Sequence, residues 1–332
     1  MSYLKNKEKY WEKEEWKEKY SNFLCYAFDG ESEKSVKWYM DPYADPDSLN
    51  TNCTALYQDI TTFLNIKEEE LSKKLKEKFV YVYEPLESPY IQVKTDQTDN
   101  ILFYLKTDQF GFSAPSKAKS HPYDSYILLD EDRQQRCIRI HNVAKWIFDS
   151  RSLGGCFVWP LDERADKRLD VAYNRLRGGS IKRKGGSYIQ DRVDLTLLEL
   201  KYIIERGDLE QSFYDKLILG NQFKLKANMK TWLEHFNGNF KNYVEFFCFD
   251  DFVDGNEIIN ILKDSCLSKE NINVKEIYND GQCRIDDKTL ETMLIKLNKM
   301  IVQRSQKMEC IVNSLKKTTC RKENFAVAER KA

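Results

Sequence analysis

Charged and amide side chains concentrate in one central stretch of this sequence. Asn174 and Arg177 lie in the run Y-N-R-L-R-G-G, and Asp191, Arg192 and Glu199 follow within D-R-V-D-L-T-L-L-E. An arginine side chain binds phosphate oxygens in pairs, and a carboxylate orients a sugar hydroxyl, a water or a metal ion. We therefore predict that these five side chains cluster in space. The two arginines would contact phosphate, and the aspartate or the glutamate would be the candidate catalytic group.

A helix predicted from Asp191 to Glu205 would carry much of this site. Its apolar stripe consists of Val193, Leu197, Leu200 and Ile204. Arg192, Thr196 and Glu199 share a second face, because they are spaced by four and three residues. Two interpretations stay open. This face is either a capped helix end with a surface ion pair of little energetic value, or one wall of an internal cleft. The run L-T-L-L-E-L-K favours the cleft, because charged side chains on a largely buried helix need partners.

The loop before this helix is rich in glycine and in positive charge. It reads R-G-G-S-I-K-R-K-G-G-S and contains Lys182, Arg183 and Lys184. From Arg164 to Arg192 there are nine Lys and Arg residues and three Asp and Glu residues. Exposed amides and cations beside a helix start can bind phosphate. The loop matches neither the P-loop nor the dinucleotide-binding fingerprint, so a ligand-binding loop and an ordinary solvated loop both remain open.

Other catalytic signatures are weak or absent. His141 and Asn142 suggest a metal-dependent nuclease of the histidine–asparagine kind. The segments L-G-G-C-F-V-W-P and Tyr173-Asn174 weakly resemble strand and helix segments of such enzymes. No second histidine lies close by in the sequence, and Cys156 would be a poor ligand for a metal that favours oxygen. The sequence also has no G-x-S-x-G motif of a serine nucleophile.

The sequence gives little support for a metal site. Three isolated histidines and the absence of C-x-x-C predict that there is no structural zinc site. Asp250 and Asp251 are paired carboxylates that could bind Mg²⁺, but such pairs more often cap a helix end or lie in a surface loop. The cofactor, if there is one, remains unknown at this level.

Composition sets broad limits on class and partners. The chain has 332 residues, of which 41% are apolar and 32% charged, with 53 basic and 53 acidic side chains. This balance is typical of a globular protein, and nucleic-acid binding would have to rest on a local patch. No apolar run approaches the roughly 20 residues that span a bilayer, and the charged N-terminus does not resemble a signal peptide. We expect a soluble cytoplasmic protein whose nine scattered cysteines are reduced and mostly buried.

The predicted fold class is α+β, a mixed and mostly antiparallel sheet from the first half packed by helices. All seven prolines occur by Pro160, so the second half should be largely helical. Strands are predicted at 79–83, 90–94, 101–105, 126–129, 137–140 and 156–159. Helices are predicted at 3–28, 52–64, 67–78, 191–205, 209–219, 226–236 and 239–248. The expected organisation is a charged helix at 1–28, one domain at 29–285 with its polar motif at 151–201, and a long helix with a tail at 286–332.

The predicted C-terminal helix spans residues 287–316. Its apolar seam comprises Leu290, Leu294, Leu297, Ile301, Met308, Ile311 and Leu315. Arg304 interrupts this seam. A coiled coil and a helix packed on its own domain both fit the pattern. The coiled coil would make residues 287–316 the contact with a second copy or with a protein partner.

Five motifs, in this order, resemble a bacterial family of unknown function over about residues 28–255. They are D-P-D-S (45–48), R-S-L-G-G-x-x-V-W-P (151–160), N-R-L-R-G (174–178), D-R-V-D-L-T-L-L-E (191–199) and F-F-C-F-D-D-F (246–252). The family pattern falls on Gly154, Pro160, Asn174, Arg177, Gly178, Asp191, Arg192, Asp194, Leu195, Thr196 and Glu199. The long basic insertion before Asp191 departs from it. The resemblance implies a bacterial intracellular domain with a central polar motif, and it implies no activity.

Two hypotheses about function follow. In the first, the polar cluster binds a phosphate-bearing ligand, either a nucleotide or a nucleic acid, with or without catalysis. In the second, the protein is a non-enzymatic interaction component, for example of a defence or toxin–antitoxin system, and binds a partner through its terminal helices. A pocket around Arg192 and Glu199 would favour the first hypothesis, and exposed apolar stripes on the terminal helices would favour the second.

Overall fold

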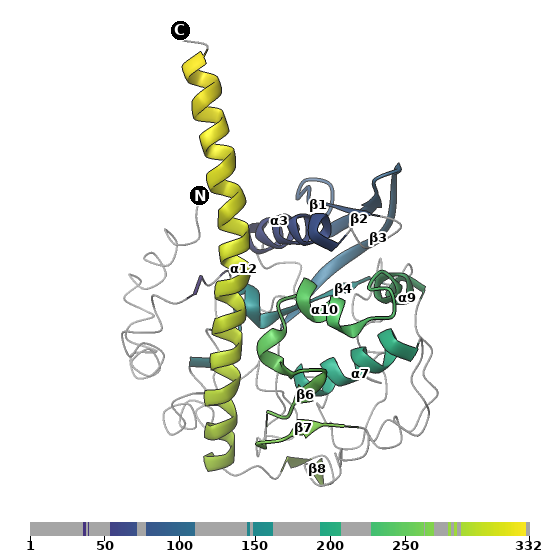
Figure 1. Ribbon diagram of the computed structural model, residues 1–332, viewed down its shortest axis with the longest axis vertical. Coiled ribbons are helices and arrows are strands. Elements are labelled where there is room, and N and C mark those ends of the chain that lie inside the picture. Colours follow the sequence, from purple (N-terminus) through teal and green to yellow (C-terminus); the bar gives the residue numbers. More distant parts are fainter. Residues whose placement is uncertain are drawn as a thin grey trace.

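The main sheet has four antiparallel strands in the order β1-β2-β3-β4 (Figure 1). The computed structural model describes residues 36–37, 39, 54–71, 78–109, 145–146, 149–161, 193–206, 227–261, 263–268, 278–279, 282–283 and 287–329. The strands are β1 (Phe79–Val82), β2 (Ile91–Thr95), β3 (Thr98–Gln109) and β4 (Cys156–Pro160). Four predicted strands are thereby confirmed, although β3 is longer than expected. The strands predicted at 126–129 and 137–140 lie outside the described residues.

One face of this sheet is aromatic and packs on a helix. Phe79, Tyr81 and Phe103 surround Trp232 of α9 (Ala227–Glu234), with ring centroids 6.2–6.5 Å from the indole. Their alternation along β1 and β3 gave the period of two by which the strands were predicted. All of these rings are buried, so this face forms a large part of the core.

The helix α3 (Thr54–Leu71) corrects a prediction. The sequence predicted two helices, at 52–64 and 67–78, whereas the structure has one continuous helix that ends at Leu71. Its buried face runs without interruption through Ile60, Leu64, Glu68 and Leu71. This helical spacing continues across the expected break, and tertiary contacts keep the intervening turn helical.

The second half is helical, as predicted, with short strands between the helices. Its helices are α7 (Val193–Arg206), α9, α10 (Phe240–Phe246) and α12 (Asp287–Glu329), with 3-10 turns η4 (Leu153–Gly155) and η6 (Asp250–Phe252). The strands that the sequence did not predict are β5 (Val253–Asp254), β6 (Glu257–Ile259), β7 (Cys266–Leu267), β8 (Tyr278–Asn279) and β9 (Gln282–Cys283). Each has only two or three residues, too few to show an alternating pattern. The helices predicted at 3–28 and 209–219 lie outside the described residues.

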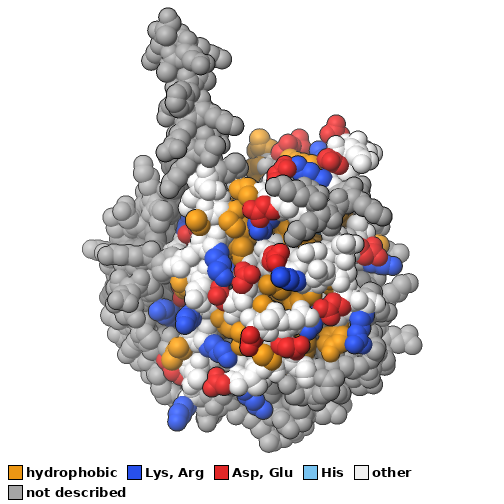
Figure 2. All heavy atoms as spheres, in the orientation of Figure 1, with side chains coloured by type: hydrophobic (Ala, Val, Ile, Leu, Met, Phe, Trp, Pro, Cys, Tyr) orange, Lys and Arg blue, Asp and Glu red, His pale blue; other side chains and the backbone are white. Residues whose placement is uncertain are grey.

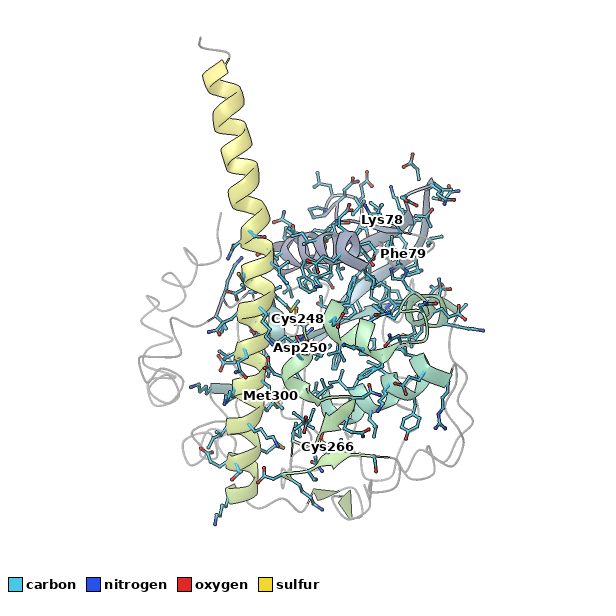
Figure 3. The ribbon with its side chains drawn as sticks, in the orientation of Figure 1. Lys78, Phe79, Cys248, Asp250, Cys266 and Met300 are labelled. Carbon is cyan, nitrogen blue, oxygen red and sulfur yellow. The ribbon has the colours of Figure 1, made fainter. Side chains whose placement is uncertain are left out.

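The long helix α12 packs lengthwise on the rest of the chain. Leu294, Leu297, Ile301 and Met308 are almost fully buried, and the helix contacts η4, α3 and η6. Cys248 and Asp250 lie close beside it (Figure 3). The seam from Leu294 to Met308 is therefore covered by the protein's own chain, as in the second of the two interpretations. The C-terminal part of α12 extends beyond the other elements (Figure 1).

Two further features of the described residues concern membrane spanning and the cysteines. No helix in the described part of the chain is long and apolar enough to cross a membrane. Of the cysteines within that part, Cys156 and Cys248 are buried, Cys266 is partly buried and Cys310 is exposed.

Candidate functional site

The R-S-L-G-G motif forms a tight junction with α12. The amide of Gly154 donates to Ser305 Oγ at 2.9 Å, and Ser152 Oγ lies 2.6 Å from the same hydroxyl. A Cβ atom at Gly154 would lie 2.4 Å from the Ile301 carbonyl oxygen and 2.4 Å from the Ser305 amide nitrogen. Glycine is therefore required here for the close approach of two backbones. The motif that the sequence placed in a polar site thus docks a helix.

Arg304 fixes the same junction from the α12 side. Its guanidinium donates to the carbonyl oxygens of Gly154 at 2.7 Å, Cys156 at 2.9 Å and Phe247 at 2.8 Å, and lies 3.9 Å from the Phe249 ring centroid. Burial lowers the pKa of this guanidinium to about 10, so it remains charged at neutral pH. Arg304 interrupts the apolar seam of α12 because this position must donate to three buried carbonyl oxygens.

Of the residues predicted to bind ligand, Thr196 is described by the structure, and its side chain is 1% exposed. It is the middle residue of the face predicted to carry Arg192 and Glu199, so this side of α7 points into the protein. Asp194, in the first turn of α7, is equally buried and accepts the Ile261 amide at 3.1 Å. The helix start is thereby fixed against the loop that follows β6.

The other predicted site residues lie outside what the structure describes. Glu199 belongs to α7, but its side chain is not among the described ones. The remaining residues of the predicted cluster and loop are Asn174, Arg177, Lys182, Arg183, Lys184, Asp191 and Arg192. The clustering of these side chains therefore stays a prediction.

Asp250 and Asp251 are engaged with a lysine of α12. Lys307 Nζ lies 2.8 Å from Asp251 Oδ2 and 3.5 Å from Asp250 Oδ2. This arrangement supports the structural interpretation of the pair over a magnesium site. Within the described residues, no group of three or more His, Cys, Asp and Glu side chains is arranged to hold a metal ion.

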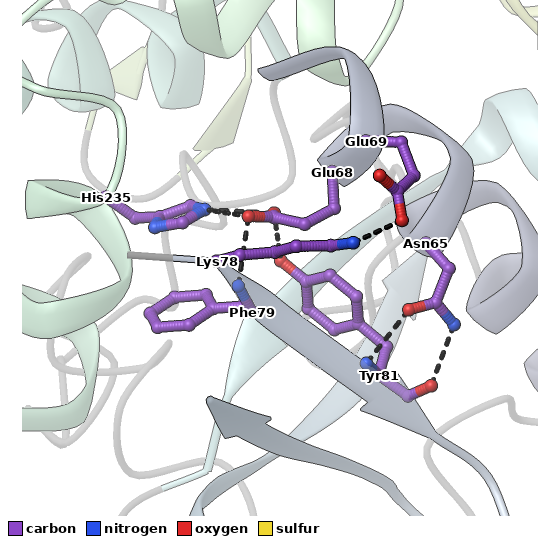
Figure 4. A network of polar contacts seen from close by, with 7 residues as sticks. All are labelled: Asn65, Glu68, Glu69, Lys78, Phe79, Tyr81 and His235. Carbon is purple, nitrogen blue, oxygen red and sulfur yellow. Dashed lines mark hydrogen bonds and ion pairs between the residues drawn. The ribbon is translucent and has the colours of Figure 1, made fainter. Parts of the chain in front are cut away.

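A buried glutamate and histidine connect α3, β1 and the turn after α9 (Figure 4). His235 Nε2 lies 3.0 and 2.9 Å from the two carboxylate oxygens of Glu68. The Tyr81 hydroxyl and the Phe79 amide donate to the same carboxylate at 3.1 and 3.0 Å. The imidazole stacks on the Phe79 ring at 3.9 Å. Burial and the neighbouring carboxylate raise the pKa of Tyr81 well above its usual value, so the phenol keeps its proton and donates.

This network closes the open edge of β1. Asn65 donates to the Tyr81 carbonyl at 2.8 Å and accepts the Tyr81 amide at 3.1 Å, as a neighbouring strand would. The Glu68 carboxylate accepts the Phe79 amide, and a spacing of three places the Asn65 and Glu68 side chains on one face of α3. Covering an edge strand prevents unwanted pairing with other chains. We therefore assign Glu68 and His235 a structural role.

Replacing Glu68 by glutamine is expected to lower the free energy of unfolding by about 1–3 kcal/mol, because one of its buried donors would lose its acceptor. Urea denaturation measures this change. The matched control is Glu69→Gln, since Glu69 is an exposed neighbour that pairs with Lys78. An exposed ion pair contributes about 0–1 kcal/mol, so the control should change little. Equal effects of the two variants would contradict the network's structural role.

Positive and negative side chains are interspersed on the described part of the face in Figure 2, and neither sign forms a large area there. The described elements define an α+β domain with a four-stranded antiparallel sheet, closed by buried polar contacts from α3 and α12. The chain belongs to DUF6994, a family of unknown function, whose model matches residues 69–308. No curated protein and no solved structure matches the chain.

The family match confirms the resemblance and corrects its extent. The match begins at residue 69 rather than near 28, and it continues to residue 308 rather than ending near 255. It therefore includes Arg304 and Ser305, which dock the R-S-L-G-G turn. Sequence reasoning missed Glu68 and His235. The sequence does contain one signal for Glu68, because it lies on the same apolar stripe of α3 as Leu64 and Leu71.

Proposed function

We propose that this protein binds a phosphate-bearing ligand through the basic segment between β4 and α7. The observation that carries the proposal is the burial of Thr196. By sequence spacing Thr196 shares a helix face with Arg192 and Glu199, and charged side chains on a buried face need a partner. A ligand with phosphate groups would be such a partner for arginines.

The two ends of this basic segment are firmly anchored. The Leu161 amide, directly after β4, donates to the Tyr104 carbonyl at 2.7 Å, and the Leu161 carbonyl accepts Asn228 Nδ2 at 2.7 Å. Val193, at the start of α7, is fully buried. The described chain therefore stops in the core at Leu161, beside β3, and resumes in the core at Val193. Its excess of nine basic over three acidic residues, from Arg164 to Arg192, precedes the positive end of a helix.

Individual roles follow from side-chain chemistry. Arg177 and Arg192 would each contact phosphate oxygens, and Asn174 would donate to a neighbouring oxygen. Asp191 or Glu199 would orient a sugar hydroxyl, a water or a metal ion. Lys182, Arg183 and Lys184 would add positive charge that attracts the phosphate groups.

The loop contribution can be tested by replacing Lys182, Arg183 and Lys184 with serine. Binding to phosphate groups releases counterions, so the affinity for short RNA or DNA should fall steeply with salt, and the triple variant should have a flatter salt dependence. Fluorescence anisotropy between low and physiological salt measures this. The protein should remain folded, since exposed substitutions usually cost less than about 0.5 kcal/mol each.

The matched control removes three positive charges elsewhere, at the exposed side chains of Lys230, Lys241 and Lys299. Its salt dependence should equal that of the wild type. If both triple variants lose the same affinity, the loop has no special role. If the wild type binds neither oligonucleotides nor nucleotides at low salt, the proposed function is wrong.

A second function is favoured by the shape of α12. Its 43 residues correspond to a length of about 65 Å, and its C-terminal part extends beyond the other elements in Figure 1. The extended part could bind a protein partner or a second copy in a non-enzymatic interaction component, such as one of a defence or toxin–antitoxin system. Light scattering of the full chain and of a chain ending at Ser314 tests the second copy. If the full chain and the shortened chain form particles with the same number of chains, self-association through this part of the helix is contradicted.

A further inference from the structure

One side of β3 is open over the first residues of the strand. β3 spans Thr98–Gln109, but β4 pairs with it only from Leu105 to Gln109. The Leu161 amide extends this contact by one bond, to the Tyr104 carbonyl at 2.7 Å. Within the described part of the chain, no strand pairs with residues 98–103 on the side away from β2. We call this side of residues 98–103 the open edge of β3.

Apolar side chains accompany the open edge. Ile101 and Leu102 are each 40% exposed, and they are two of the four exposed large apolar side chains among the described residues. The register between β2 and β3 skips a residue here, since Val93 pairs with Phe103 and Lys94 pairs with Ile101. This bulge leaves Leu102 without an opposite residue on β2, and two consecutive apolar side chains reach the solvent.

The two outermost strands of the same sheet are engaged by side chains. Asn65 and Glu68 bind the backbone of β1, and Arg304 donates to the Cys156 carbonyl at the start of β4. Proteins commonly protect an uncovered strand edge with lysine or proline, because such an edge pairs with other extended chains. The run T-D-N-I-L at 98–102 contains neither residue, and each of its five residues is exposed. The open edge of β3 is therefore suited to binding another strand.

We propose that the open edge of β3 pairs with the same edge of a second copy of this chain, as antiparallel strands. Two copies related by a two-fold axis present the same donors and acceptors to each other in opposite directions. With the axis at Ile101, Leu102 of one copy lies opposite Asn100 of the other. Asp99 then lies opposite Phe103, so that no acid faces an acid. The main sheets of the two copies become one continuous sheet.

The place of the hairpin in the fold permits this approach. The turn between β2 and β3 lies at the periphery in Figure 1, on the opposite side of the molecule from the extended part of α12. The edge is short, so the contact buries less surface than a stable dimer needs, and pairing depends on concentration. This association requires neither the phosphate-bearing ligand nor the end of α12.

A charge exchange at Ile101 tests the symmetric pairing. Analytical ultracentrifugation of the full chain, from low to high micromolar concentration, should show dimers of the wild type. Ile101→Lys and Ile101→Glu should each weaken self-association at least about tenfold, because like charges face each other across the axis. An equimolar mixture of the two variants should regain most of the lost affinity, because opposite charges then face each other.

Two further measurements accompany this test. Ile295→Lys is the matched control, since it makes the same exchange at an apolar side chain of α12 that is 54% exposed. It should leave self-association unchanged, and urea denaturation should show that every variant is as stable as the wild type. Amide exchange of the wild type should slow in residues 98–103 when the concentration rises, because pairing protects backbone amides.

Each contrary outcome overturns the pairing. The proposal is wrong if the wild type stays monomeric at every concentration, or if both Ile101 variants associate like the wild type. It is also wrong if the mixture associates no better than each variant alone, or if ending the chain at Ser314 abolishes the dimer. The proposed phosphate binding is measured with oligonucleotides and nucleotides, so it stands or fails separately.

Discussion

The variant Gly154→Ala is expected to destabilise the protein by roughly 3 kcal/mol or more, because overpacking against backbone atoms cannot be relieved by a rotamer change. The added Cβ would lie 2.4 Å from the Ile301 carbonyl oxygen, the Ser305 amide nitrogen and the Ser305 hydroxyl. The turn and α12 would have to move apart. Urea denaturation followed by tryptophan fluorescence gives the free energy of unfolding.

Gly255→Ala is the control for this glycine. Gly255 has a φ of +60°, and no atom lies within 4 Å of the position that a Cβ would take there. Alanine at this position meets backbone strain alone, with an expected cost of about 1 kcal/mol. If Gly154→Ala costs no more than this control, the close contact between the R-S-L-G-G turn and α12 is wrong.

Arg304→Leu is expected to cost about 3–5 kcal/mol, because three buried carbonyl oxygens would lose their donor. The sequence pattern alone predicts the opposite, since leucine would complete the apolar seam of α12. Thermal and urea denaturation decide between these outcomes. Arg304→Lys keeps the charge but lacks the planar fork, so it should recover only part of the loss. A leucine variant as stable as the wild type would contradict the role of the guanidinium.

The strands and helices were predictable where a local pattern is long enough to show its period. The alternation around Phe79 and Tyr81 gave β1, and the apolar stripe of α7 gave that helix within two residues at its start. The break predicted within α3 failed because the burial of Glu68 against His235 depends on residues 167 positions apart. A pattern of neighbouring residues cannot predict such a contact. The two-residue strands after η6 fail for a related reason, since their pairing is set by tertiary packing.

The sequence alone did not assign the roles of the polar residues that hold the described fold together. The R-S-L-G-G turn was included in the polar motif at 151–201, whereas in the structure Gly154 allows the close approach of α12. Arg304 was recognised as a break in the seam, but its three acceptors come from segments distant in sequence. Gln92 and Lys106 are buried, although single polar residues in strands are common on solvated sheet faces. Their burial is a property of the assembled fold.

Amide hydrogen exchange with and without the best-binding nucleotide shows where a ligand contacts the chain. If a phosphate-bearing ligand binds to the basic segment that precedes α7, amides of that segment should be protected. We expect slower exchange in peptides from residues 162–192, with unchanged exchange in residues 287–314 of α12. Slower exchange confined to α12, or unchanged exchange in both regions at saturating nucleotide, would contradict binding at this site.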